Sequence, residues 1–79
     1  MDILGQFIAE CCVELEQDSE GASELYAAYK DYAEKQGHNA MTATAFGLRM
    51  GERGFEKKRQ SPSRRFGYLG IRLRRLGDA

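Results

Sequence analysis

Apolar residues recur at three- and four-residue spacing over the first fifteen positions of the chain. This stripe predicts a helix from Asp2 to about Leu15, and its members are Ile3, Phe7, Ile8, Cys11, Cys12 and Leu15. Asp2 stands at the start of the helix, where a carboxylate complements the positive end of the helix dipole. The pattern indicates a helix that packs one face into a core.

A second helical stripe follows a polar connection at residues 16–22. Ser23 is expected to cap this helix, which runs to about Gln36 and stops at Gly37, and Ala22 is expected to contribute a short edge strand. The stripe consists of Leu25, Tyr26, Ala28, Tyr29, Tyr32 and Ala33. Its tyrosines could stack on bases, but beside a leucine at helical spacing we expect them in the core and at its rim.

The stretch from Met41 to Arg65 predicts a short helix followed by a basic hairpin. Thr42 is a good N-cap, and Met41 and Phe46 have the spacing of a hydrophobic staple. Gly54 can take the left-handed conformation that ends a helix. The second and third helices are joined by a short turn, which is typical of helix-turn-helix units.

Beyond the third helix the pattern becomes that of strands. Residues 55–60 are predicted as one strand, 61–63 as the turn of a wing, and 64–73 as the returning strand, because its apolar residues alternate with polar ones. Gly67 is expected to mark a bulge. Residues 74–79 are expected to form a tail.

These elements predict one α+β domain over residues 1–79, a winged helix-turn-helix with three helices and a small antiparallel sheet. The expected order is helix, short strand, helix, helix, strand, wing, strand. A chain of this length buries only roughly 60% of its unfolded surface, so its stability is expected to be small.

The third helix is predicted to have two very different faces. Phe46 and Met50 share one face, and the opposite face carries Thr44, Gly47, Leu48 and Gly51. That opposite face would enter a major groove, yet it holds no charge and none of the Asn, Gln or Arg side chains that recognise bases. Its small residues could instead allow close approach of nucleic acid or protein.

The formal net charge is zero, but the charges are separated along the chain. Residues 1–40 hold nine acids and two lysines, whereas residues 41–79 hold ten Lys or Arg and three acids. The balances of −7 and +7 point to a polyanionic partner for the basic half. The alternative is that the two halves neutralise each other in the fold.

Other candidate chemistry is weak. Cys11 and Cys12 are interpreted as small buried hydrophobes in a reducing compartment, since two thiols and one histidine cannot form a four-ligand zinc site. The acidic connection lacks the pattern of a calcium loop and is expected to be solvated. His38 is expected to be a turn residue. No metal or cofactor is expected, and no apolar run approaches a membrane span.

Several short motifs together resemble one family. They are Phe7-Ile8-x-Glu10-Cys11-Cys12, Ala22-Ser23-Glu24-Leu25-Tyr26-x-x-Tyr29, Ala45-Phe46-Gly47-x-Arg49, Arg53-Gly54-Phe55, and Arg64-Arg65-Phe66 with Leu69-Gly70-Ile71. The chain resembles the C-terminal winged-helix domain of phage and plasmid primase-helicases, a class related to the poxviral primase-helicase. It departs from that pattern at Leu48, where a basic residue is usual, and at Gly67.

The resemblance implies a module at the end of a larger cytoplasmic DNA-replication protein, whose helicase domain would lie upstream. The chain has no G-x-x-x-x-G-K-[ST] loop for ATP, so we expect no enzymatic activity and no cofactor. We expect largely non-specific binding to duplex, forked or single-stranded DNA, and no membrane partner. The candidate DNA-binding residues are Thr44, Leu48, Arg49, Arg53, Lys57, Lys58, Arg59, Arg64 and Arg65.

Two other classes of function make different demands on the sequence. A protein-interaction module would dock a replication partner or a neighbouring subunit through the neutral face of the third helix. An enzyme would need paired carboxylates, an activated nucleophile or metal spacing, and the sequence shows none of these.

Overall fold

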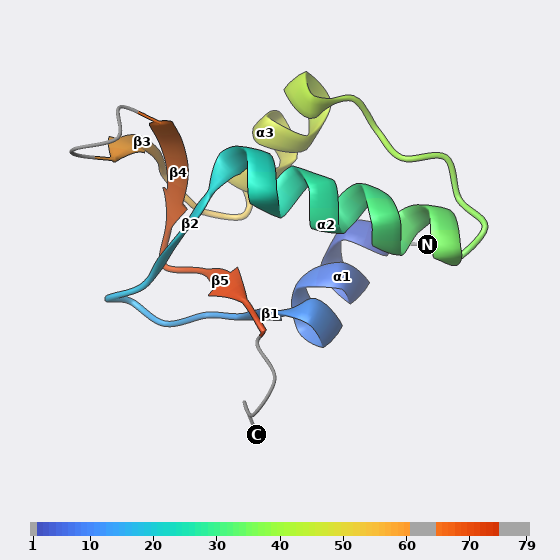
Figure 1. Ribbon diagram of the computed structural model, residues 1–79, viewed down its shortest axis with the longest axis horizontal. Helices are drawn as coiled ribbons and strands as arrows, with labels where there is room; N and C mark the ends of the chain where they lie inside the picture. Colours follow the sequence, from blue (N-terminus) through green and yellow to red (C-terminus); the bar gives the residue numbers. More distant parts are fainter. Residues whose placement is uncertain (1, 61–64, 75–79) are drawn as a thin grey trace.

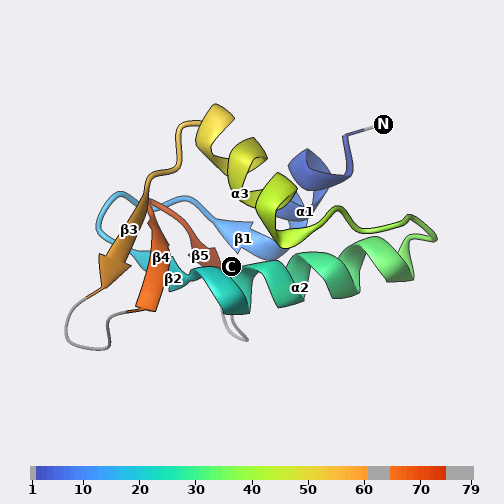
Figure 2. The ribbon, with the colours of Figure 1, turned by 90° about the horizontal axis from the view of Figure 1, so that it is seen from above.

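The computed structural model describes residues 2–60 and 65–74, with the backbone alone at residues 59, 60 and 65. In chain order the elements are α1 (Ile3–Cys11), β1 (Cys12–Val13), β2 (Ser19–Gly21), α2 (Ala22–Lys35), α3 (Ala43–Glu52), β3 (Lys57–Gln60), β4 (Arg65–Leu69) and β5 (Arg72–Leu73). Helix α2 crosses the middle of the molecule, and the strands gather near the end where it begins (Figure 1). Seen from above, α1 and α3 lie on the same side of α2 (Figure 2).

Helix α1 is shorter than its apolar stripe predicts. The Asp2 carboxylate accepts the Gly5 N–H over 3.1 Å, so the helix begins as expected. It ends at Cys11, because Cys12 is extended (φ −126°, ψ 160°) and belongs to β1, which pairs with β5. The predicted continuation to Leu15 was wrong, since a strand near the other end of the chain takes over the backbone hydrogen bonds of this segment.

Helix α2 begins earlier than predicted. Gly21 occupies the N-cap position without a side-chain hydrogen bond, so the predicted cap at Ser23 was wrong. The edge strand ends at Gly21, and Ala22 is already the first residue of the helix. Gly37 has a φ of 78° and follows the helix, as predicted. Because Gly21 pairs with the middle strand of the sheet, tertiary pairing sets where the helix starts.

Strands β2, β4 and β3 form an antiparallel sheet in that order. The predicted pairing of the two hairpin strands is confirmed, although β3 begins at Lys57 rather than Phe55. The register runs without a slip past Gly67, which lies opposite Lys58 on one side and Gly21 on the other. The predicted bulge at Gly67 was therefore wrong.

The returning strand is divided in two. It was predicted as one strand to Leu73, but the chain turns at Gly70, which has a φ of 82° and donates its N–H to the Asp18 carbonyl over 2.8 Å. Strand β5 then leaves the three-stranded sheet and pairs with β1. Alternation of apolar residues cannot reveal this turn, because the period of two continues with Ile71 buried on the far side of the turn.

Helix α3 has the predicted ends. The Thr42 hydroxyl accepts the Ala45 N–H over 3.2 Å, which confirms the N-cap. Gly54 has a φ of 92° and follows the C-cap residue Arg53. The local signals were sufficient here, because both ends of this helix depend on neighbouring residues in the chain.

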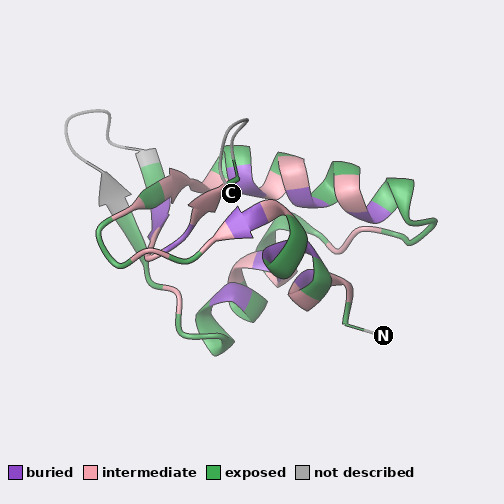
Figure 3. Ribbon diagram, turned by 90° about the horizontal axis from the view of Figure 1, so that it is seen from below, coloured by how far each residue is buried: buried purple, intermediate pink, exposed green. Residues whose placement is uncertain are grey.

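The core lies between the three described helices and the sheet (Figure 3). Phe46 is at its centre, with ring centroids 5.0 Å from Tyr29 and 6.1 Å from Tyr68. The buried side chains are Leu4, Phe7, Ile8, Cys12, Leu25, Tyr29, Ala33, Phe46, Met50, Tyr68 and Ile71. Each described helix and both sheets contribute, so the elements share a single core.

The α+β class is confirmed for the described residues, which contain three helices and a small antiparallel sheet. The order of the helices, and a sheet in which the last long strand lies between the other two, are compatible with a winged-helix-like arrangement. The two added strands, β1 and β5, were not predicted. The predicted wing turn at residues 61–63 lies outside the described residues.

Candidate nucleic-acid interface

The outer face of α3 is neutral and partly apolar, as its sequence predicts. Thr44, Leu48 and Gly51 are exposed, whereas Phe46 and Met50 on the opposite face are buried. Leu48 has 66% of its surface exposed, so the largest apolar side chain of this face is open to solvent. This face offers no charge to a phosphate and no amide to a base edge.

Gly47 is the exception on this face, because it turns partly toward the sheet. A Cβ atom there would lie 3.3 Å from the Tyr68 hydroxyl, closer than most such contacts. The glycine therefore lets β4 approach the helix. The small residues of this face were expected to let nucleic acid or protein approach closely. At Gly47, the group that approaches is Tyr68 of the protein itself.

The two arginines of α3 have carboxylate partners. Arg49 donates to Glu52 over 2.9 Å within the same turn, and Arg53 donates to Asp2 at the start of α1. Arg53, together with the Gly5 N–H, holds the pKa of the Asp2 carboxyl below its usual range. Arg53 thus ties α3 to α1, and neither arginine is the unpaired cation that the candidate site assumed.

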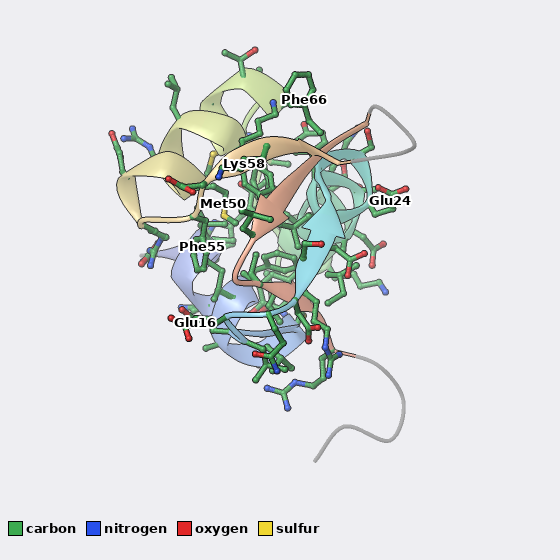
Figure 4. The ribbon with its side chains drawn as sticks, turned by 90° about the vertical axis from the view of Figure 1, so that its left-hand side faces the viewer. Glu16, Glu24, Met50, Phe55, Lys58 and Phe66 are labelled. Carbon is green, nitrogen blue, oxygen red and sulfur yellow. The ribbon has the colours of Figure 1, made fainter. Side chains whose placement is uncertain are left out.

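The lysines of β3 differ from these arginines and from each other. The Lys57 ammonium lies over the Phe66 ring, 5.3 Å from its centroid, a cation–π contact. The Lys58 ammonium lies 3.7 Å from the Glu56 carboxylate, with both side chains exposed. The two side chains belong to neighbouring residues of one strand, so they point to opposite faces of the sheet. Lys58 and Phe66 are labelled in Figure 4.

The structure describes only some of the remaining basic residues that were predicted to bind DNA. Arg59 pairs with Phe66, and Arg65 pairs with Gln60, so both lie on the β3–β4 pair. Arg64 lies outside the described residues. The strand pairing brings the candidate residues of β3 and β4 together, but it separates them from Arg53, which points to α1.

Phe66 and Tyr68 are features that the candidate site left out. Phe66 has 47% of its surface exposed beside Lys57, whereas Tyr68 is 2% exposed and packs against Phe46. Two aromatic residues spaced by two positions in a strand share a face, and this was the available signal. Gly67, which lies between them, was predicted to mark a bulge instead.

The acidic connection is less solvated than expected. The Asp18 carboxylate accepts from Arg72 over 2.9 Å, and the Glu20 carboxylate accepts the Leu73 N–H over 2.9 Å. These contacts hold β5 against the connection between β1 and β2. The two halves of the chain therefore neutralise each other in part, and this reduces the number of basic residues left for a polyanion.

The tyrosines of α2 are structural, as expected. The Tyr26 hydroxyl donates to the Met41 carbonyl over 2.9 Å, and the Tyr29 hydroxyl accepts the Met41 N–H over 3.1 Å. Tyr32 donates to Glu10. These bonds fix the segment that leads into α3 and one side of α1.

The cysteines are free thiols. Cys12 is buried, and that burial raises its pKa to about 12, while burial also raises the pKa of the half-buried Cys11. Within residues 2–60 and 65–74, no cluster of three or more His, Cys, Asp or Glu residues could hold a metal ion. No helix among these residues has the length and apolar character needed to cross a membrane.

Comparison with known proteins gives one family. The family model described as Poxvirus D5 protein-like matches residues 1–70 of the chain. The match extends from the first residue through the end of β4, so it includes α3 and the β3–β4 pair. No curated protein matched the chain. The relation to the poxviral class that the motifs indicated is confirmed at this level, and placement at the C-terminal end of a longer protein stays a prediction.

Proposed function

The chain belongs to the Poxvirus D5 protein-like family, and on that premise we propose that it is a non-catalytic DNA-binding module of a replication primase-helicase. It would lie at the C-terminal end of that protein, beyond a helicase domain. Its own role would be to hold DNA mainly by the phosphate backbone, without reading a sequence.

The observation that carries this proposal is the basic β3–β4 pair beside α3. Lys57 and Lys58 are exposed on β3, and Arg59 and Arg65 follow on the paired strands. Lysine and arginine side chains on a hairpin of this kind bind phosphates through charge and release counterions from the DNA. The family match covers this pair of strands, and the resemblance of the chain to primase-helicases supports the link to replication.

Sequence-specific binding is not part of the proposal. The exposed residues of α3 offer a threonine, a leucine and a glycine to a major groove, and both arginines of the helix have carboxylate partners. Base recognition needs bidentate donors and acceptors at such positions. We therefore expect similar affinities for duplexes of different sequence.

A salt titration with a charge-matched control tests the proposal. If about five phosphates are bound, the logarithm of affinity should fall with the logarithm of salt concentration at a slope of roughly −4 to −5. The double variant Lys58→Glu, Arg65→Glu should abolish binding. The control, Lys30→Glu with Lys35→Glu on α2, changes net charge equally and should retain most of the affinity. Equal losses in the two variants, or unchanged binding in the first at low salt, would contradict the proposal.

The exposed Leu48 favours a second candidate function. A protein partner, such as a neighbouring subunit or another replication protein, could cover this leucine and the small residues around it. The variant Leu48→Lys discriminates between the two functions. It should weaken binding of a protein partner, whereas DNA affinity should stay equal or increase because a cation is added to the outer face of α3.

A further inference from the structure

A small cavity lies where α2 and α3 begin and where β3 and β4 pass beside them. Its volume is about 240 Å³. It is lined by Ala22, Ser23, Tyr26, Ala43, Phe46, Lys57 and Tyr68. The cavity is separate from the outer face of α3, because Phe46 lies on the buried side of that helix.

Two helix N-termini meet at this cavity. Helix α2 starts at Ala22, with Gly21 at its N-cap and the Glu24 carboxylate folded back beside Gly21. Helix α3 starts at Ala43, and the Thr42 hydroxyl satisfies the Ala45 N–H. The first N–H groups of each helix have no partner within the helix, and the dipole gives both ends partial positive charge. Such ends favour an anion.

Tyr68 supplies a second and independent indication. The residue is 2% exposed, yet its hydroxyl makes no hydrogen bond within the described residues. Among the described residues, every side-chain oxygen or nitrogen atom that is fully buried has a hydrogen-bond partner. The Tyr68 hydroxyl has no such partner, so it is not fully buried and keeps access to solvent. Tyr68 lines the cavity, so that access runs through it. A phenol with a buried ring and a hydroxyl open to the cavity can donate a hydrogen bond to a group bound there.

The charges around the cavity also favour an anion. Lys57 lines it, and no ion pair with a carboxylate is formed by this lysine among residues 2–60 and 65–74. The Glu20 carboxylate accepts the Leu73 N–H, whereas the Glu24 carboxylate folds back beside Gly21, at the start of α2. That end of the cavity already has an anionic group, so the donors left for another anion are the start of α3, the Tyr68 hydroxyl and the Lys57 ammonium.

We propose that this cavity binds a phosphate group through the Lys57 ammonium, the Tyr68 hydroxyl and the first N–H groups of α3. The next step rests on the proposed function: the phosphate group in the cavity would belong to the backbone of the bound DNA. One phosphate held in a cavity would fix how the β3–β4 pair lies on the duplex, whereas Lys58 on the opposite face would add affinity through charge alone.

The first experiment uses inorganic phosphate and the whole 79-residue chain. Amide NMR spectra are recorded during titration with phosphate and, separately, with chloride at the same ionic strength. Phosphate should shift the amides of Ala43 and Thr44, and chloride should not. Equal shifts with both anions, or none in these two residues, would overturn the proposal even if the chain binds DNA.

The second experiment removes the hydroxyl while keeping the ring. Tyr68→Phe should lose the phosphate-specific shifts and weaken binding to an unphosphorylated duplex roughly tenfold, because hydrogen bonds to charged groups are among the stronger ones. Lys57→Gln should do the same. The matched control, Lys58→Gln, removes the same charge from the other face and should keep the phosphate shifts while weakening DNA binding.

The outcomes separate this inference from the proposed function. Phosphate shifts without any DNA affinity would support the cavity and overturn the DNA-binding module. DNA affinity that depends on Lys58 but not on Tyr68 would support the module and overturn the cavity. If Tyr68→Phe weakens binding only of a duplex with a 5′-terminal phosphate, the assignment to the backbone is overturned. An unchanged far-ultraviolet circular dichroism spectrum and a cooperative thermal unfolding transition confirm that each variant is folded.

Discussion

Helix α3 and strand β3 are adjacent in the chain and both carry basic residues, but their cations differ in what they contact. Arg49 and Arg53 of the α3 segment are paired with carboxylates of the protein itself, on Glu52 and Asp2. On β3, Lys57 lies over an aromatic ring and Lys58 has only a long, exposed contact with Glu56. An exposed ion pair contributes little to stability, yet it lowers the charge that a cation offers to a partner.

The comparison shows that a count of basic residues overstates the candidate interface. Ten Lys or Arg residues occupy the second half of the chain, but several of them hold the fold together, as Arg72 does with Asp18. The contact that a basic residue makes within the protein decides whether it stabilises the fold or stays available to bind a phosphate. The strand therefore carries the proposed contacts with DNA, and the helix positions the strand.

The largest expected effect separates the two faces of α3. Phe46→Ala should destabilise the protein by roughly 3–5 kcal/mol, because it removes a ring that three tyrosines contact at the centre of the core. Leu48→Ala on the exposed face should change stability by less than about 0.5 kcal/mol. Thermal and urea unfolding followed by circular dichroism measure both variants. Similar losses in the two would mean that the outer face is not free.

The next effect tests strand against helix in DNA binding. Lys58→Gln should reduce the magnitude of the salt slope by about 1, because one phosphate contact is lost. Arg53→Gln should leave the slope unchanged, since that guanidinium is held by Asp2. Fluorescence anisotropy at several salt concentrations gives both slopes. A larger change in slope for Arg53→Gln would assign the phosphate contacts to the helix instead.

A pair of glycines in α3 tests how closely the helix and the sheet pack. At Gly51 an added Cβ would meet nothing within 4 Å, so Gly51→Ala should stabilise the protein by roughly 0.5–1 kcal/mol through helix propensity. At Gly47 the Cβ would lie 3.3 Å from the Tyr68 hydroxyl, so the gain should be smaller or absent. Equilibrium unfolding of the two variants decides. Equal gains would show that β4 does not limit the space at this position.

The smallest effect concerns the contact of Arg53 with Asp2. The pKa of Asp2 is lowered from its ordinary value of 3.8, so the carboxylate stabilises the fold above that pH, and this contribution is lost as pH falls through the lower folded-state value. Asp2→Asn should weaken the acid dependence of stability in that range. Thermal midpoints at about pH 6 and about pH 3 measure it. The effect should be small, because both side chains are exposed to solvent.

The elements that the sequence predicted well are those whose ends depend on nearby residues. Thr42 caps α3, Gly37 and Gly54 take left-handed conformations after their helices, and the third helix has one buried and one neutral exposed face. Each of these signals acts within a few residues. The motif pattern also indicated a relation to the poxviral class, and the family match over residues 1–70 agrees with that relation.

The errors lie where a distant strand decides the local structure. Cys12 leaves the helix because β1 pairs with β5, and Gly67 forms no bulge because strands pair with it on both sides. The split at Gly70 follows from the same pairing, since β5 joins β1 rather than the sheet. The spacing of residues within one short segment cannot reveal the pairing of β1 with β5, because these two strands lie at opposite ends of the chain.

The sequence by itself determined the class of fold, the caps of α3, the neutral face of that helix and the separation of charge between the two halves. The tertiary structure decided which charges remain available. Arg53 is directed to Asp2 and Arg72 to Asp18, whereas Lys57 is placed beside Tyr68 and the starts of two helices. The physical reason is that charge is a property of a residue, but a charge's partner is fixed only when distant segments pack together.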